Sequence, residues 1–199
     1  MPTPATAKLH ETIAASLRDT ARLLIELPAE QIARVAGAAE AMAKALKARR
    51  KVIWFGNGGS ATQSQHMAAE FVGRFLKERR SLPSLSLTEN MASVTAIAND
   101  YDYESIFARQ LEGLGRKGDV AVGLSTSGSS PNVLAALRKA KTMGLATIGL
   151  TGAKGVRMQS LCDVCLLVPS TETARIQEAH LTIGHILCGL VEEALTARR

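Results

Sequence analysis

Two short turns rich in glycine and hydroxyl residues have the composition of a phosphate-binding site. Residues 56–60 read Gly-Asn-Gly-Gly-Ser, and residues 125–130 read Ser-Thr-Ser-Gly-Ser-Ser. Each turn follows an apolar run and precedes a segment with the apolar spacing of a helix. The first N–H groups of a helix have no partner within it, and the helix dipole favours an anion there. We therefore expect the two turns to bind one phosphate monoester from two sides.

The first turn also fits a loose form of the dinucleotide-binding fingerprint, Gly-x-Gly-x-x-Ala, over residues 56–61. That fingerprint needs an acidic residue about 20 positions later, at the end of the second strand. The nearest acid beyond the predicted second strand is Glu89, well past that spacing. A dinucleotide site also has no need of the second turn, so the sequence favours a phosphate monoester.

His66 and Glu70 lie four residues apart in the segment after the first turn, so they share one face of the predicted helix. Apolar neighbours indicate that this helix is largely buried, and a buried carboxylate needs a partner or a function. A single histidine on such a helix is usually a hydrogen-bonded core residue. The His-x-x-x-Glu pair beside a phosphate turn favours a functional role instead.

The last predicted helix carries several polar residues among apolar ones, namely Arg175, Gln177, Glu178, His180 and His185. Gln177 and His185 are eight residues apart, which separates them by about 80° around the helix and ~12 Å along it. An ideal helix does not easily direct both at one small ion. Either the long glutamine side chain reaches round, or another subunit completes the site. His180 is nearer to Gln177 and competes with His185.

The remaining pattern predicts an α/β fold, a three-layer αβα sandwich whose parallel sheet has helices on both faces. Ligands bind such sheets beyond the carboxyl ends of the strands, where both turns lie. We expect a helical extension over residues 1–50 that packs on the domain or on another subunit, and one domain over 51–199. Ser130 precedes Pro131 and is the expected N-cap. Strands are predicted at 51–55, 84–87, 119–124, 145–150 and 164–168, and helices at 8–26, 30–49, 60–76, 89–98, 103–114, 131–143, 155–160 and 173–197.

Composition excludes several classes of protein. The chain has 199 residues and is 46% hydrophobic, which suits one buried core. Its net charge of +6 comes largely from clusters at 49–51, 77–80 and 198–199, which we interpret as solvated helix ends rather than a nucleic-acid surface. Aromatic residues are only 4% of the chain, too few for stacking on single strands. A modest positive field also suits an anionic sugar phosphate.

The chain shows no signal-peptide core and no run of about 18 apolar residues, so we expect a cytoplasmic protein that does not span a membrane. Three cysteines fit a reducing compartment. Cys162 and Cys165 form a CxxC string at the start of an apolar run. Residues three apart in a strand point to opposite faces, so we expect core or edge packing rather than a disulfide or a metal site.

Taken together, five motifs resemble those of the phosphoheptose isomerases in the sugar isomerase (SIS) superfamily, and the resemblance spans nearly the whole chain. It implies a five-stranded parallel sheet and a homotetramer with active sites at subunit interfaces. These enzymes interconvert sedoheptulose 7-phosphate and D-glycero-D-manno-heptose 7-phosphate, the entry step to the heptose of bacterial surface polysaccharides. The motifs are Asn57-Gly58-Gly59-Ser60, Gln65-His66-x-x-x-Glu70, Thr95-Ala96-Ile97-Ala98-Asn99-Asp100, Ser125-Thr126-Ser127-Gly128-x-Ser130 and Ala174-Arg175-Ile176-Gln177-Glu178.

The same resemblance implies a role for each matching residue. Glu70 would move a proton between C1 and C2 through an enediol, and His185 would assist ring opening and protonation of oxygen. One zinc ion per subunit would be held by His66, Glu70, Gln177 and His185. The substrate would contact Glu70 and Gln177, the backbone of Gly58 and Gly59, the phosphate-binding Ser60, Ser125, Thr126, Ser127 and Ser130, and the hydroxyl-binding Asn57, Asn99 and Asp100.

Two alternatives belong to other functional classes. One is a non-catalytic SIS protein that binds the replication initiator and lacks a carboxylate equivalent to Glu70 and the full Ser-Thr-Ser-Gly turn; this chain keeps both. The other is a sugar-phosphate sensor, which usually sits beside a DNA-binding domain. Residues 1–50 show no helix-turn-helix turn chemistry. Both alternatives predict no isomerisation of sedoheptulose 7-phosphate.

Overall fold

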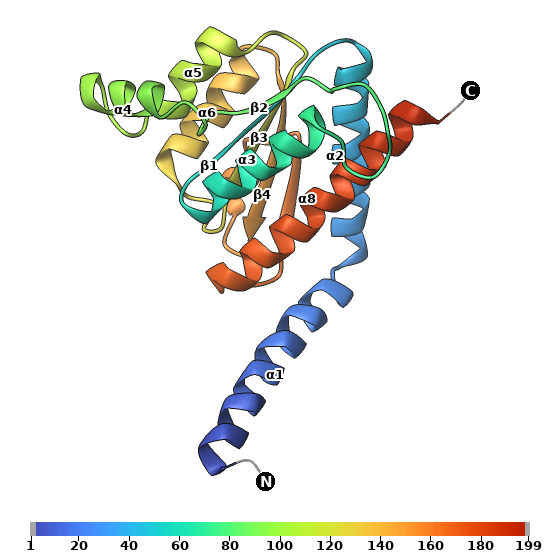
Figure 1. Ribbon diagram of the computed structural model, residues 1–199. Helices are drawn as coiled ribbons and strands as arrows, with labels where there is room; N and C mark the ends of the chain where they lie inside the picture. Colours follow the sequence, from blue (N-terminus) through green and yellow to red (C-terminus); the bar gives the residue numbers. More distant parts are fainter. Residues whose placement is uncertain (1–2, 198–199) are drawn as a thin grey trace.

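A five-stranded, all-parallel sheet lies at the centre of the computed structural model, which describes residues 3–197 (Figure 1). The strand order is β2-β1-β3-β4-β5, so β1 and β3 are neighbours, with Val52 opposite Val120 and Gly56 opposite Leu124. Chain connections leave β1 and β3 in opposite directions across the sheet, which makes this pair the topological switch point. The strands are β1 Val52–Gly56, β2 Ser84–Ser86, β3 Val120–Ser125, β4 Ala146–Gly152 and β5 Val164–Val168.

Helices cover both faces of the sheet, which confirms the three-layer sandwich. Alternate residues of β1 enter different cores: Trp54 packs under α2, α3 and α8, whereas Phe55 packs under α5, α6 and α7. Because both faces of the sheet are buried, the two central strands β1 and β3 consist of apolar residues and glycine up to Ser125. The helices are α1 Pro4–Ile25, α2 Ala29–Lys47, α3 Gly59–Val72, α4 Met91–Asp100, α5 Ile106–Leu114, α6 Pro131–Thr142, α7 Val156–Gln159 and α8 Thr173–Thr196.

The two N-terminal helices differ in their packing. Helix α2 contributes buried residues such as Val35 and Met42 to the core and forms part of the helical layer. Helix α1 projects from the body of the molecule (Figure 1). Leu9, Ile13 and Leu17 on α1 remain 59%, 51% and 67% exposed. Within one subunit, α1 therefore presents an apolar stripe that the chain itself does not cover.

Helix α3 is shorter than its apolar spacing indicates. The sequence predicts a helix to residue 76, but α3 ends at Val72, with Gly73 as its C-cap. The N–H groups of Phe75 and Leu76 instead donate to the carboxylate of Glu192 on α8, at 3.0 and 2.8 Å. A long-range contact thus overrides the local helical pattern.

The CxxC pair departs from its predicted geometry. Cys162 precedes β5 rather than lying in it, so the argument from alternating strand faces is wrong. Both sulfur atoms lie against Gly149, at 2.8 and 3.1 Å from the position that a Cβ would occupy there. Both thiols are free; Cys165 is buried in the core and Cys162 is partly buried beside it. The burial of the two cysteines agrees with the predicted role in packing.

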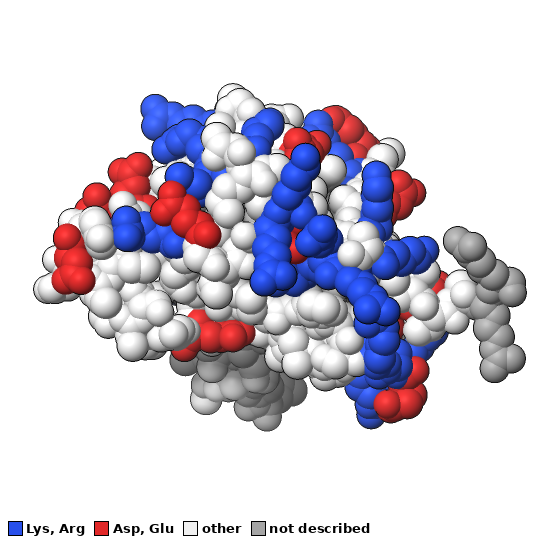
Figure 2. Space-filling model, turned by 90° about the horizontal axis from the view of Figure 1, so that it is seen from above, with Lys and Arg blue, Asp and Glu red and all other residues white. Residues whose placement is uncertain are grey.

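Figure 2 views the amino ends of the strands and shows basic side chains gathered on that side of the molecule. Lys44, Arg50 and Lys117 line a groove there, where α2 ends. Cations at a helix C-terminus offset the negative end of its dipole. This basic surface lies at the opposite edge of the sheet from the two turns. Within residues 3–197 no helix combines the length and apolar character that a membrane span needs.

Candidate active site

The two turns meet because their strands are neighbours. The first connects β1 to α3, and the second connects β3 to α6. Gly58, at a φ of 54°, is the N-cap of α3, and Ser130 is the N-cap of α6 as predicted. Neither residue caps its helix with a side-chain hydrogen bond, in contrast to Thr3 on α1 and Asn90 on α4. At the start of α6, Pro131 has no N–H group and Val133 N–H donates to Asn132 Oδ1 at 2.9 Å, so an anion here would bind to the N–H groups of Asn132 and of Gly59 in α3.

Three of the predicted phosphate-binding hydroxyls converge in the second turn. Ser125 Oγ lies 2.9 Å from Ser130 Oγ and 3.4 Å from Ser127 Oγ. Ser127 Oγ is exposed to solvent and accepts hydrogen bonds from the N–H and Oγ of Ser129. Ser60 is buried at the start of α3, and Thr126 is half-buried. The turn thus offers hydroxyl donors on the same side as the helix N-termini.

The shape of the second turn depends on Gly128. Its φ of 63° is unfavourable for other residues, and a Cβ there would collide with the backbone of Gly155 and approach Thr151 Oγ1 to 2.7 Å. A larger residue would push the serines away from β4. Gly128 is therefore a structural requirement of the turn.

A reciprocal pair of amides joins the two turns. Asn57 Nδ2 donates to Asn132 Oδ1, and Asn132 Nδ2 donates to Asn57 Oδ1, both at 2.9 Å. Tyr103 Oη also donates to Asn57 Oδ1, at 3.0 Å. Asn132 is 1% exposed and lies in the first turn of α6. Sequence reasoning missed this residue, because an asparagine after a helix-starting proline carries no signal of a partner 75 positions away.

Asn99 and Asp100 end α4, a helix without a buried residue. Both side chains are exposed, and within residues 3–197 their one side-chain hydrogen bond joins Asn99 Nδ2 to Asp100 Oδ1 at 2.9 Å. A pocket beside the first turn is lined by Asn57, Gly58 and Tyr103 together with α4 residues. The structure does not bring Asn99 and Asp100 into contact with the turns.

His66 and Glu70 meet His185 where α3 and α8 run side by side (Figure 1). His66 Nε2 lies 2.9 Å from His185 Nε2 and 3.4 Å from Glu70 Oε1. One potential ligand atom from each of the three residues lies within 4.8 Å of the other two. The ring of Phe75 stacks on His185 with centroids 5.5 Å apart and planes 19° apart.

The donor set and spacing of this group fit zinc. Imidazole nitrogens and a carboxylate are common zinc ligands, and two ligands at ~2.0–2.1 Å from a tetrahedral ion lie roughly 3.3 Å apart. The separations of 2.9 and 3.4 Å bracket that distance. His66 is exposed, so an ion here would have an open side for a substrate oxygen.

Gln177 lies elsewhere within the subunit. Its amide rests against Gly59, where a Cβ would meet Gln177 Nε2 at 2.5 Å, and its backbone carbonyl accepts from Gln63 Nε2 at 2.7 Å. Gly59 precedes His66 by seven residues, or about 10 Å along α3. The glutamine therefore does not reach round α8 to join His185, and it stands beside the phosphate turn.

His180 is separated from this group by burial. It is 1% exposed, and neither ring nitrogen has a hydrogen-bond partner within the described residues. Burial lowers the pKa of His180 to about 4, which keeps the ring neutral. Of the two histidines that the sequence left in competition, His185 is the one that meets His66 and Glu70.

Known proteins are similar to this chain in both sequence and fold. The SIS domain family model matches residues 17–152. A phosphoheptose isomerase from a Nitratiruptor species is 56% identical over 151 residues, 76% of this chain and 81% of that one. Another from Thermodesulfovibrio yellowstonii is 47% identical over 188 residues, 94% of each chain. The chain belongs to the phosphoheptose isomerases. The resemblance seen in the five motifs is confirmed.

A solved structure of a phosphoheptose isomerase from Neisseria gonorrhoeae superposes with a TM-score of 0.87 at 38% identity, covering 93% of this chain and 99% of that one. This chain and that enzyme therefore share the same fold. The relatives are named as isomerases. The site of this chain contains a carboxylate and two histidines, which are groups that can transfer protons in an isomerisation.

Proposed function

We propose that the protein is an aldose–ketose isomerase that interconverts sedoheptulose 7-phosphate and D-glycero-D-manno-heptose 7-phosphate. The observation that carries the proposal is the coexistence of two anion-binding turns with a carboxylate beside two histidines, in a chain that belongs to the phosphoheptose isomerases. Isomerisation needs a remote handle, a base beside a carbonyl carbon, and an acid or cation for the developing enediolate.

The turns supply the handle. The N-terminal ends of α3 and α6, together with the hydroxyls of Ser125, Ser127 and Ser130, hold the phosphate, with Ser60 and Thr126 beside them. Asn57 keeps one amide hydrogen free of its pairing with Asn132, and this hydrogen donates to a sugar hydroxyl. Binding energy from this unreacting end positions the carbon chain.

Glu70 and His185 supply the proton chemistry. The Glu70 carboxylate removes the proton from one carbon and returns it to the neighbouring carbon, because an enediol makes the two carbons equivalent partners for the same base. His185 moves protons on the oxygens. A zinc ion held by His66, Glu70 and His185, with Gln177 supplied by a neighbouring copy, would polarise the carbonyl oxygen when bound.

The distances within one subunit support active sites shared between subunits. Glu70 follows Ser60 by ten residues, which is about 15 Å along α3. With C–C bonds of ~1.5 Å, an extended seven-carbon sugar phosphate reaches only about 10 Å from C1 to phosphorus. One substrate would have to be almost fully extended to reach from the turn to Glu70 of the same chain, which favours a neighbouring copy as the source of one of them. Gln177, which lies with the turn, then joins His66 and Glu70 of that neighbour.

We further propose a cytoplasmic homotetramer with one zinc ion per subunit, serving the heptose of bacterial surface polysaccharides. The exposed apolar stripe of α1 supports assembly, and the group His66, Glu70 and His185 supports the metal. Elemental analysis of the purified protein should find about one zinc per chain. Chelation should lower activity, and zinc should restore it; full activity after complete zinc removal would contradict the metal's role.

The test of the activity is direct. Purified full-length protein mixed with sedoheptulose 7-phosphate should produce a second heptose 7-phosphate, followed by NMR until both sugars stand at equilibrium. A protein that binds the sugar phosphate and leaves it unchanged would contradict the isomerase proposal and favour a sensing or initiator-binding relative.

A further inference from the structure

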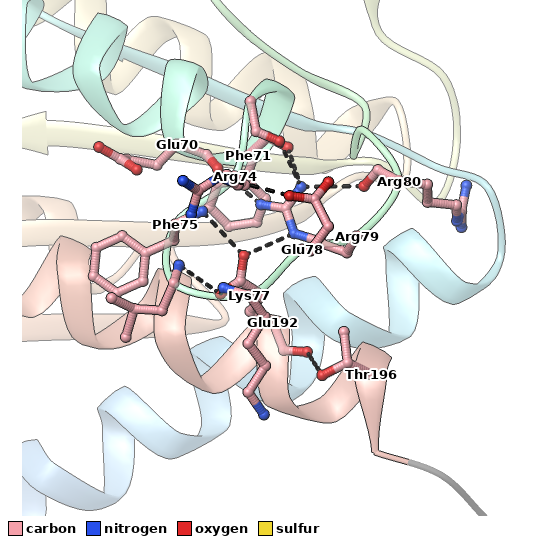
Figure 3. Close-up of polar contacts among 12 residues, drawn as sticks. Glu70, Phe71, Arg74, Phe75, Lys77, Glu78, Arg79, Arg80, Glu192 and Thr196 are labelled. Carbon is pink, nitrogen blue, oxygen red and sulfur yellow. Dashed lines mark hydrogen bonds and ion pairs between the residues drawn. The ribbon is translucent and has the colours of Figure 1, made fainter.

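A buried ion pair lies where α3 ends against the last turns of α8 (Figure 3). Arg79 Nε donates to Glu192 Oε1 at 2.9 Å, and the two side chains are only 6% and 2% exposed. Removing two charges from water costs free energy that a single contact rarely returns. The pair is tolerable only because both partners make many further hydrogen bonds, and those bonds lead toward the proposed catalytic residues.

Glu192 organises the segment that follows α3. Its carboxylate accepts the N–H groups of Phe75, Leu76 and Lys77 at 3.0, 2.8 and 2.8 Å. These bonds fix the backbone of Phe75, whose ring stacks on the His185 ring. One arm of the ion pair thus ends at His185.

Arg79 organises the end of α3 itself. The last carbonyl groups of a helix have no partner within it. Arg79 Nη2 donates to the carbonyl of Glu70 at 2.8 Å, and Nη1 donates to those of Phe71 and Gly73 at 2.9 and 3.0 Å. Figure 3 shows the guanidinium among these carbonyls. The other arm of the ion pair thus ends at the backbone of Glu70.

We infer that Arg79 and Glu192 are positioning residues for the isomerase reaction. Through one buried ion pair they hold Glu70 on α3 and His185 on α8 at the separation that proton transfer and metal binding require. This inference rests on the proposed function. Neither residue touches the substrate, and both act through the residues they hold.

A second ion pair, in which the carboxylate is buried, provides a matched control. Lys51 Nζ lies 2.6 Å from Asp119 Oδ2, and the Asp119 side chain is 1% exposed. Asp119 also accepts backbone N–H groups, from Lys51 and Arg116 at 3.0 and 2.8 Å. This pair lies at the amino ends of β1 and β3, at the opposite edge of the sheet from the turns. Its loss should therefore lower stability without moving Glu70 or His185.

The experiment compares Glu192→Gln and Arg79→Lys with Asp119→Asn in the full-length protein. Arg79→Lys keeps the charge and loses the forked set of donors. All three variants should lower the melting temperature. Only Glu192→Gln and Arg79→Lys should lower kcat by tenfold or more while KM changes less than threefold, because the phosphate turns lie at the other end of α3. Kinetics matching those of Asp119→Asn would overturn the inference.

Zinc affinity gives a readout that does not depend on turnover. Residues that orient metal ligands typically change affinity 10–100-fold when replaced. Competition with a chelator should show weaker zinc binding in Glu192→Gln and Arg79→Lys, and wild-type binding in Asp119→Asn. Equal affinity in all four proteins would overturn the inference. Inactivity of the wild type would refute the proposed function and leave this affinity test intact.

Phe75→Leu tests the contact between Phe75 and His185 without changing the ion pair. This variant remains informative if the others do not fold. Phe75 is half-buried, so the fold should survive its replacement. We expect a kcat three- to tenfold lower and weaker zinc binding, because His185 loses its stacking partner. Wild-type kcat together with wild-type zinc affinity would overturn the arm that ends at His185.

Discussion

Burial separates the two histidines of α8 at the scale of single residues. His185 is half-buried and meets His66 at 2.9 Å, whereas His180 is buried without a hydrogen-bond partner in residues 3–197. Five residues of helix place the two rings in different surroundings. One ring is available for chemistry, and burial of the other favours its neutral form.

The buried His180 should make stability depend on pH. Its pKa falls from 6.5 to about 4 on folding, so between these pH values the unfolded chain binds more protons. The free energy of unfolding therefore rises with pH through this window and falls as acid is added. From pH 7 to pH 5 the loss is about 2 kcal/mol. His180→Leu should remove this part of the loss in denaturant unfolding at fixed protein concentration.

The control for that measurement is His10→Gln, because His10 is exposed on α1. It should keep the pH dependence of the wild type. Equal losses of stability between pH 7 and pH 5 in His180→Leu and the wild type would show that folding does not lower the pKa of His180.

Some residues of the candidate site can be predicted from the sequence, and others cannot. His66 and Glu70 are predictable because residues four apart share a helix face. His185 could be narrowed only to a choice with His180, since periodicity does not reveal which side of α8 faces α3. Asn132 was missed, because its partner Asn57 lies on a separate strand turn and only the sheet order brings them together.

At the scale of elements, the Asn57–Asn132 amide pair joins the starts of α3 and α6. Asn132→Ala should cost about 1–3 kcal/mol of stability, because Asn57 loses a buried partner. The two turns then hold the phosphate less well, so KM should rise at least fivefold with a smaller change in kcat. Steady-state kinetics and thermal unfolding measure both effects.

Gln31→Ala is the matched control for Asn132→Ala. Gln31 on α2 is also a buried amide, and its Oε1 accepts from the N–H of Leu167 at 2.8 Å. The Gln31→Ala variant should be less stable than the wild type and keep the wild-type KM. The same rise in KM for both variants would mean that general loosening, and not the link between the turns, sets phosphate binding.

Elements were predictable where local patterns decide them. The predicted strands 51–55 and 119–124 lie within one residue of β1 and β3, because their apolar runs are buried on both faces. The end of α3 was missed. Gly73 is a residue typical of helix ends, but Phe75 and Leu76 continue the apolar spacing beyond it, and their N–H groups donate instead to Glu192, more than a hundred residues away.

At the scale of the whole molecule, helix α1 should hold copies of the chain together. In a single subunit Leu17 is 67% exposed, so Leu17→Glu should leave the fold of each subunit intact and weaken assembly. Light scattering should show a mass below that of four copies. Activity should fall with the mass, because the proposed active site takes its phosphate turn and its Glu70 from different copies.

Arg18→Gln is the control for this prediction, because Arg18 is exposed and lies about 100° around α1 from Leu17. It should keep the mass and activity of the wild type. A Leu17→Glu protein that is smaller than the wild type yet fully active would contradict active sites shared between subunits.

The proposed function requires that Glu70 transfers the proton in isomerisation while the turns hold the phosphate. The most direct measurement follows sedoheptulose 7-phosphate by NMR in D2O with the wild type and with Glu70→Gln, alongside the dissociation constant for the sugar phosphate. The wild type should form the aldose, with deuterium at C2 to the extent that the proton held by Glu70 exchanges with solvent before it is returned. Glu70→Gln should bind the sugar phosphate with a dissociation constant within a few-fold of the wild type and produce no aldose. Turnover by Glu70→Gln at a rate near that of the wild type would contradict the account.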